Sequence, residues 1–241
     1  MGRPSDERER IRTASDWYLT GQLPFDRELI RFRYRTLRPF IRGPRGLELG
    51  SAEGNMTRLI TDDFDQLTVV DGARQLLDTM PNFANVTKVL SLIEDFSPSE
   101  AFDTVIIDHL LEHVADPHSI LESARSWLAP SGVMLVGVPN AHSIHRLIGV
   151  KMGLLAAPTD LNDRDRAQGH RRVYTPESFE RELRNARLRV VHLGGVFLKP
   201  LSNQQIQDNW DDALKEAFYQ LGAEFPHHAA ELFAVCESDP P

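Results

Sequence analysis

Short runs of hydrophobic and β-branched residues alternate with amphipathic segments through most of the chain. The runs are typical of buried strands, and they lie at 46–50, 66–70, 86–90, 102–108, 132–138, 188–197 and 231–237. Between the early runs, helical spacing or capping residues occur at 54–64, 73–80 and 116–130. This alternation predicts an α/β fold with a seven-stranded, mostly parallel sheet covered by helices on both faces.

Two segments are extra to this alternation. Residues 1–45 predict a helical N-terminal cap in front of a core of residues 46–241. Residues 139–175 form an excursion after the fifth run that is much longer than a normal crossover, and we predict a lid there, because insertions at the carboxyl edge of such sheets often cover a site. A shorter extra segment, 199–229, precedes the last run, which suits an added strand.

The composition narrows the class of protein. A chain of 241 residues with 41% hydrophobic content can build one α/β core. No apolar run approaches the roughly 18 residues of a membrane helix, and the start "MGRPSDERERIR" has no signal-peptide core. Asp6 stands where a myristoylation signal needs Ser or Thr. A cytoplasmic protein without stable membrane association is therefore expected.

Cysteine and charge exclude further classes. Cys236 is the only cysteine, which excludes disulfide frameworks and cysteine-based metal clusters, and no metal site is predicted. The net charge is −8, and an acidic chain without a strong basic stripe is a poor binder of nucleic acid. We therefore expect a small-molecule partner and no nucleic acid, while the oligomeric state stays open.

The stretch "LELGSAEGNMT" resembles a dinucleotide loop but matches only its first glycine. Glu48, at the end of the predicted strand, would repel a pyrophosphate and attract an ammonium group. Asp71 follows 23 residues later, at the end of the next predicted strand, where an acid accepts hydrogen bonds from two ribose hydroxyls. Ammonium and ribose without pyrophosphate favour S-adenosylmethionine over NAD.

Six stretches together resemble the class I S-adenosylmethionine-dependent methyltransferases, in the subgroup that includes the ubiquinone-biosynthesis O-methyltransferases and many small-molecule methyltransferases. They are "LELGSAEGNMT", "VVDGA", "SLIEDF", "FDTVIIDHLLEHVADP", "GVMLVGVPNAHS" and "GHRRVYTPESF". They span residues 46 to about 190, and "LLEHVADP" is the most specific of them. The resemblance implies a Rossmann-like fold.

The resemblance also implies roles for single residues toward the cofactor. Glu48, Gly50 and Gly54 match the loop around its methionine part, Asp71 the ribose-binding acid, Leu92 and Ile93 the frame of the adenine, and Asp108 and His109 the end of the fourth strand beside its amino-acid end. Two positions depart from the pattern. Ala52 replaces the usual middle glycine, and Gly72 replaces the usual apolar residue beside adenine.

Histidines are the candidate catalytic residues. A hydroxyl acceptor must lose a proton and gains from a general base with a near-neutral pKa, whereas a neutral amine needs little help. His109 and His113 lie four apart, on one side of a helical turn. His113 is a candidate base or a brace for its loop, and His109 is a candidate for catalysis or for shaping the cofactor site.

The candidate substrate-binding residues come from the lid and the cap. They are Tyr18, Asn140, His142, His145, His170, Arg171 and Tyr174. The arginine could orient a polar or anionic acceptor. The other interpretation is a solvated lid surface, with Tyr18 and Trp17 acting as hydrophobic anchors of the cap.

These features predict an enzyme that moves a methyl group from S-adenosylmethionine to an oxygen or nitrogen of a polar small molecule, such as a secondary metabolite or a sugar-like acceptor. A quinone or lipid precursor is the alternative acceptor, because "LIGVKMGLLAAP" is apolar. Two rivals belong to other classes. A nicotinamide-dependent dehydrogenase is disfavoured by the missing glycines, and a non-catalytic cofactor-binding protein by the histidines of the lid.

Overall fold

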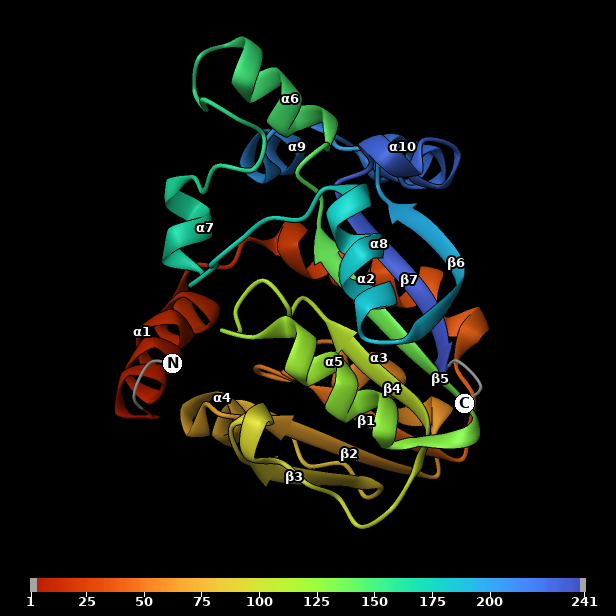
Figure 1. Cartoon of the computed structure of the whole chain (residues 1–241). Coiled ribbons are helices and arrows are strands. Elements are labelled where there is room, and N and C mark those ends of the chain that lie inside the picture. Colours follow the sequence, from red (N-terminus) through yellow and green to blue (C-terminus); the bar gives the residue numbers. More distant parts are fainter. Residues whose placement is uncertain (1–3, 239–241) are drawn as a thin grey trace.

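A seven-stranded sheet forms the centre of the protein (Figure 1), in a computed structural model that describes residues 4–238. Its strands are β1 (Arg45–Leu49), β2 (Gln66–Asp71), β3 (Val86–Leu90), β4 (Phe102–Asp108), β5 (Leu128–Pro139), β6 (Leu188–Val196) and β7 (Glu231–Ser238). Their order is β3-β2-β1-β4-β5-β7-β6; the first five are parallel, and β7 runs antiparallel to both of its neighbours. The predicted α/β fold with a mostly parallel sheet is confirmed.

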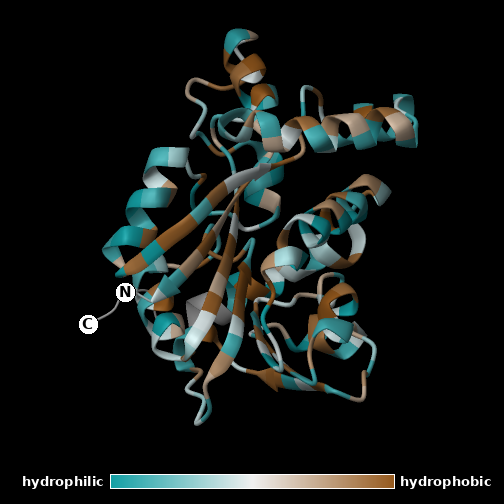
Figure 2. Cartoon of the chain, turned by 90° about the vertical axis from the view of Figure 1, so that its right-hand side faces the viewer, coloured by the Kyte–Doolittle hydropathy of each residue, from teal (hydrophilic) through white to brown (hydrophobic). Residues whose placement is uncertain are grey.

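Helices cover both faces of the sheet. One face packs against α5 (Pro117–Ser126) and α8 (Pro176–Asn185), and the opposite face against α2 (Pro24–Leu37) and α9 (Asn203–Asn209). The shorter α3 (Thr57–Ile60) and α4 (Arg74–Thr79) follow β1 and β2, and α10 (Asp212–Glu224) precedes β7. Figure 2 shows hydrophobic residues along the central strands and hydrophilic residues on outward helix faces.

Local sequence explains where α5 and α8 begin. Asp116 caps α5 by accepting a hydrogen bond from the Ser119 amide, and Thr175 caps α8 in the same way from Ser178. A proline follows each cap at the first helical position, where its missing N–H costs nothing. The cap therefore fixes the residue at which each helix begins, and each helix turns its own apolar face toward the sheet.

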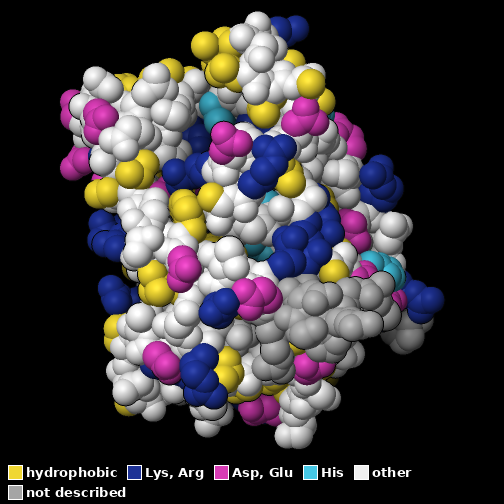
Figure 3. All heavy atoms as spheres, turned by 90° about the vertical axis from the view of Figure 1, so that its left-hand side faces the viewer, with side chains coloured by type: hydrophobic (Ala, Val, Ile, Leu, Met, Phe, Trp, Pro, Cys, Tyr) yellow, Lys and Arg dark blue, Asp and Glu magenta, His cyan; other side chains and the backbone are white. Residues whose placement is uncertain are grey.

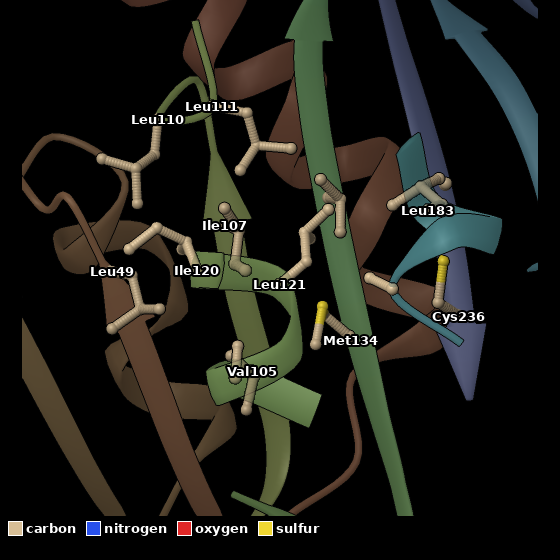
Figure 4. Close-up of a cluster of buried hydrophobic side chains, with 14 of the residues drawn as sticks. Leu49, Val105, Ile107, Leu110, Leu111, Ile120, Leu121, Met134, Leu183 and Cys236 are labelled. Atoms are coloured by element: carbon tan, nitrogen blue, oxygen red, sulfur yellow. The ribbon is translucent and has the colours of Figure 1, made fainter. Parts of the chain in front are cut away.

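The core on this side of the sheet is fully apolar (Figure 4). Ile120 and Leu121 of α5 lie over Ile107 of β4, and Leu183 of α8 lies near Cys236 of β7. Burial raises the pKa of the Cys236 thiol to about 12, so the thiol is inert.

The predicted extra segments are helical. Residues ahead of β1 form α1 (Pro4–Thr20) and α2, with a 3₁₀ turn at Arg38–Phe40. The predicted lid holds α6 (Ile144–Lys151) and α7 (Asp163–Ala167), and further 3₁₀ turns lie at Thr61–Asp63, Ile93–Asp95 and Pro226–His228. In the chain from residue 4 to 238, no helix combines the length and apolar character that crossing a membrane requires.

One buried arginine organises the lid. Arg146 of α6 donates hydrogen bonds to the carbonyls of Pro158 and Asp160 and pairs with Asp165 of α7 at 3.0 Å. Burial opposes ionisation of Asp165, but the His170 ring, whose Nδ1 lies 3.5 Å from its Oδ1, and the charge of Arg146 outweigh burial and hold its pKa low. The two lid helices are thereby linked into one unit.

Candidate functional site

A cavity of about 540 Å³ lies at the carboxyl edge of the sheet. Its floor comes from the ends of β1, β2 and β4, and its walls come from α1, α2 and the segment after α7. Figure 3 shows the face of the molecule above it, where Lys and Arg side chains lie beside Asp and Glu, with histidines visible in hollows between them. The cap and the lid thus enclose the edge where α/β folds bind ligands.

The loop after β1 bends sharply to make room for a ligand. Gly50 and Gly54 have φ of 76° and 82°, and a Cβ at Gly54 would lie 2.5 Å from Met80. Ala52 adopts the same left-handed region, with φ of 47°. Gly50 and Ala52 line the cavity, whereas Gly54 shapes the loop from behind.

Asp71 links this loop to β2. Its two carboxylate oxygens accept hydrogen bonds from the amides of Ala52 at 2.8 Å and Ala73 at 2.7 Å. Each oxygen keeps a second lone pair, and the side chain lines the cavity. Asp71 can therefore brace the loop and accept hydrogen bonds from a ligand diol at the same time.

Glu48 is buried beneath the loop. One of its oxygens accepts a hydrogen bond from the Thr57 hydroxyl at 2.6 Å, and burial raises its pKa to about 8. A buried carboxyl with a raised pKa is stabilised as an anion when a cation comes within reach. The side chain lines the cavity, so it suits a ligand with an ammonium group.

The part of the cavity where we expect the adenine is apolar. Leu92 and Ile93 are buried side chains that line the cavity. A Cβ at Gly72 would lie 3.1 Å from both Leu92 and Ile11 of α1. The departure at Gly72 therefore lets the cap helix approach the sheet, so that Ile11 contributes the apolar surface that the glycine lacks.

His109 lies between two buried carboxylates. Its Nδ1 is 3.1 Å from Glu112 and its Nε2 is 3.5 Å from Glu231, and its backbone has the left-handed φ of 55°. Burial and Arg33 lower its pKa, but the two carboxylates outweigh them and raise it. An imidazole with a carboxylate at each nitrogen is protonated at neutral pH, so His109 is unavailable as a base.

Arg33 of α2 completes this group. Its guanidinium lies 3.1 Å from Asp108 and 3.3 Å from Glu231, with 12% of the side chain exposed. Asp108 lines the cavity as predicted, and a Cβ at Gly137 on β5 would lie 2.2 Å from its Oδ1. The ends of β4 and β7 are thus held together by buried charge pairs.

His113 is in the opposite protonation state. Its Nε2 lies 3.1 Å from the Tyr18 hydroxyl, and which of the two groups donates depends on which ring nitrogen of His113 carries the proton. Burial lowers its pKa to about 4. His113 is thus a neutral imidazole and a weak base, which can take a proton only from a group that becomes acidic as it is methylated.

One group has the composition of a metal site. Glu112, His113 and His170 place potential ligand atoms within 4.8 Å of one another. Nε2 of His113 already has a hydrogen-bond partner, the Tyr18 hydroxyl. We therefore assign this group to positioning of the imidazole, with the His170 ring edge-on at 4.8 Å.

Comparison with known proteins identifies the family. The model of the methyltransferase domain family matches residues 21–193. The chain belongs to the methyltransferase domain family. The predicted enzyme class is thereby confirmed.

The relatives of this methyltransferase act on different acceptor atoms. A ubiquinone biosynthesis O-methyltransferase of Xanthomonas euvesicatoria pv. vesicatoria is 24% identical over 185 residues, covering 73% of this chain and 75% of that protein. Nodulation protein S of Rhizobium tropici is 28% identical over 130 residues, half of this chain and 53% of that one. The structure of the N-methyltransferase NodS of Bradyrhizobium japonicum with S-adenosyl-L-homocysteine covers 98% of both chains with a TM-score of 0.59 at 17% identity, and it confirms the Rossmann-like methyltransferase fold.

Two of the predicted substrate residues, Tyr18 and His170, line the cavity of the methyltransferase. Five do not: Asn140, His142, His145, Arg171 and Tyr174. Asn140 is buried and donates to the carbonyls of His227 and Ala229, while its own oxygen accepts from the His142 amide. These contacts give Asn140 a structural role at the base of the lid.

The other three residues are also held by the protein. Tyr174 is buried beside Phe179 in the core, and His145 lies in α6, where its amide donates to the Lys199 carbonyl. Arg171 donates from Nε to the His113 carbonyl at 2.7 Å. Arg171 therefore lies behind the loop after β4 that carries His113, and its hydrogen bond holds this loop in position.

Arg172 fixes the same loop further along. Its Nη1 donates to the carbonyls of Leu111 and Val114, both at 2.6 Å, and its Nη2 to that of Ala115 at 3.2 Å. A planar guanidinium suits several convergent acceptors. These hydrogen bonds therefore connect the end of the lid to the loop after β4.

Five residues that line the cavity near the cap and the loop after β1 were not among the site residues predicted from the sequence. They are Gln22, Ile30, Arg33, Glu53 and Asn55. The apolar positions of α2 could have pointed to Arg33, because Phe25, Leu29 and Phe32 form a buried stripe that brings the adjacent arginine inward. Only the fold shows that this helix faces the loop after β1.

Proposed function

We propose that this methyltransferase uses S-adenosylmethionine and transfers its methyl group to an oxygen or nitrogen of a polar small molecule. The arrangement that carries the proposal is one cavity whose lining includes Glu48 and Asp71 together with the Tyr18 and His113 pair. Solved structures of similar fold, including the DhpI–SAH complex at a TM-score of 0.60, support the choice of cofactor.

The residues fit this cofactor. The buried carboxyl of Glu48 suits its ammonium, Asp71 its ribose hydroxyls, and Leu92 and Ile93 its adenine. The left-handed Gly50 keeps the loop open, because a Cβ there would lie 3.0 Å from Leu110. A pyrophosphate supplies no cation to stabilise the Glu48 carboxylate, and the loop matches only the first glycine of a dinucleotide site, which argues against NAD.

The sulfonium supplies an activated methyl group, so the protein has to align the acceptor and exclude water. As the new bond to the methyl carbon forms, the bond from that carbon to sulfur breaks, sulfur keeps the electron pair, and the acceptor gives up one proton. His113 is neutral and can receive this proton through the Tyr18 hydroxyl. His109 is already protonated and instead keeps Glu112 and Glu231 paired.

A quinone or lipid precursor is the second candidate acceptor. The tip of the lid after α6 exposes 67% of Met152 and 70% of Leu154, which would suit an apolar surface. Neither residue lines the cavity, so a polar acceptor dissolved in the cytoplasm remains our first choice.

Two measurements test the proposal. Calorimetry with S-adenosylhomocysteine and NAD side by side should show binding of the first alone. Incubation with S-adenosylmethionine and a panel of hydroxyl and amine acceptors should then release S-adenosylhomocysteine. Binding of NAD instead would refute the cofactor, and tight cofactor binding without transfer to any acceptor would favour a non-catalytic binding protein.

A further inference from the structure

The carboxylate of Glu53 is an unused acceptor on the wall of the cavity. Its Oε1 accepts hydrogen bonds from the side-chain amides of Gln22, at 2.6 Å, and of Asn55. Its Oε2 is buried and has no hydrogen-bond partner among the described residues. The two amides fix the orientation of the carboxylate, and one oxygen is left for a ligand.

The charge of the Glu53 carboxylate is not neutralised by a buried cation of the described residues. Burial raises its pKa, and Asp71 acts in the same direction. Arg27, which acts in the opposite direction, is exposed, and Arg33 across the cavity is already paired with Asp108 and Glu231. No buried cation among residues 4–238 forms an ion pair with this carboxylate.

Glu53 is joined to the segment that carries the tyrosine of the proton-accepting pair. Gln22, which donates to its Oε1, follows Tyr18 by four residues, and the side chains of Glu53 and Tyr18 both line the cavity. A group bound at the free oxygen of Glu53 would therefore share the cavity with the tyrosine that contacts His113.

We propose that Glu53 is a specificity residue that binds an ammonium group of the acceptor, so that the substrate of this enzyme is an amine-bearing small molecule. This inference rests on the proposed function and narrows its acceptor class. An ammonium donates directly to the free oxygen and neutralises a buried charge, whereas a carboxylate or phosphate would be repelled.

The cofactor also carries an ammonium group, so the test must separate the two. The protein is first saturated with S-adenosylhomocysteine, which fills the cofactor site. Three probes that share one ring are then titrated at pH 7 by calorimetry: benzylamine as the cation, benzyl alcohol as the neutral probe and benzoate as the anion. We expect benzylamine to bind most tightly and benzoate most weakly.

Glu53→Gln removes the charge and keeps the shape. It should weaken benzylamine binding by about 10- to 100-fold, the range for a lost hydrogen bond to a charged group, and leave benzyl alcohol nearly unchanged. Glu224→Gln, at an exposed position in α10, makes the same charge change far from the cavity and should have no effect. Glu53→Asp keeps the charge one methylene further back, should retain part of the preference, and serves where the glutamine variant does not fold.

Four results would overturn the inference: equal or tighter binding of benzoate or benzyl alcohol, no benzylamine binding to the saturated protein, a preference that survives Glu53→Gln, or a parallel loss of S-adenosylhomocysteine affinity in that variant. The last would make Glu53 a cofactor contact. If the wild-type protein does not bind S-adenosylhomocysteine at all, the proposed function fails independently of Glu53.

Discussion

Replacing Asp71 with alanine separates cofactor binding from loop stability. The change removes the oxygens that accept from the Ala52 and Ala73 amides, and it removes the acceptor we assign to the ribose hydroxyls. A lost hydrogen bond to a charged group is worth about 1.5 to 3 kcal/mol, so S-adenosylhomocysteine affinity should fall by roughly 10- to 150-fold. The two unpaired amides should cost about 2 to 4 kcal/mol of unfolding free energy and lower the melting temperature by roughly 5 to 15 °C.

Calorimetric titration of the ligand and scanning calorimetry of the free protein measure the two effects. Asp103→Ala is a matched control, because Asp103 accepts a hydrogen bond from the Arg45 amide at 2.9 Å, where β1 begins. It should lower the melting temperature without changing affinity. An unchanged affinity in a folded Asp71→Ala protein would refute the assignment of the ribose site.

Three further predictions concern the pH dependence of cofactor affinity, the role of His113 as a base, and the covering of the cavity by α1 and residues 139–175. Because burial raises the pKa of Glu48 to about 8, its carboxyl is protonated in the free protein at pH 6 and must release that proton to bind an ammonium. Affinity for S-adenosylhomocysteine should therefore rise from pH 6 to 8, by up to about tenfold per unit, until the ligand amine itself loses its proton; Glu48→Gln should flatten the curve in calorimetric titrations. With a hydroxyl acceptor, His113→Asn should slow single turnover by roughly 10²- to 10⁴-fold at saturating cofactor, and much less with an amine acceptor. His109→Gln should instead lower the melting temperature by leaving the buried Glu112 carboxylate without a charged partner, while Glu231 keeps its pair with Arg33, and a reversal of these two phenotypes would contradict the assignment. Hydrogen exchange should show added protection in α1 and in residues 139–175 when S-adenosylhomocysteine binds, and protection confined to the loop after β1 would count against a cover. Gly169→Ala should weaken that protection, since its Cβ would lie 2.9 Å from the Ala14 Cβ of α1.

The sheet and its cofactor edge could be predicted because their signals are local. Each predicted hydrophobic run contains most of a strand, and Glu48 and Asp71 stand at the ends of β1 and β2, where strand direction alone brings them to one edge. The insertion of residues 139–175 was recognisable for a similar reason, since its length exceeds any ordinary crossover, and its action as a lid stays a prediction.

The sequence pointed to Tyr18, His113 and His170, but their contacts could not be predicted, because they join segments that are distant in sequence. Tyr18 meets His113 across 95 positions, and Arg33 meets Glu231 across 198. Asn140 has the polar character of a ligand-binding residue, but its partners are carbonyls 87 and 89 residues away. A polar residue near a site can serve the backbone or the ligand, and only the fold distinguishes the two.

The position of α1 has a consequence for the order of events in a catalytic cycle. Arg10 of this helix donates to the Gly169 carbonyl at 3.1 Å, and Gln75 of α4 donates to the Arg12 carbonyl at 3.3 Å, so the helix is attached on both sides of the cavity. We expect these two contacts to open before the nucleoside can be exchanged, and we expect the acceptor to enter after it. Steady-state kinetics should therefore show compulsory ordered addition, with the nucleoside bound first and released last, and maximal velocity set by the opening of one helix.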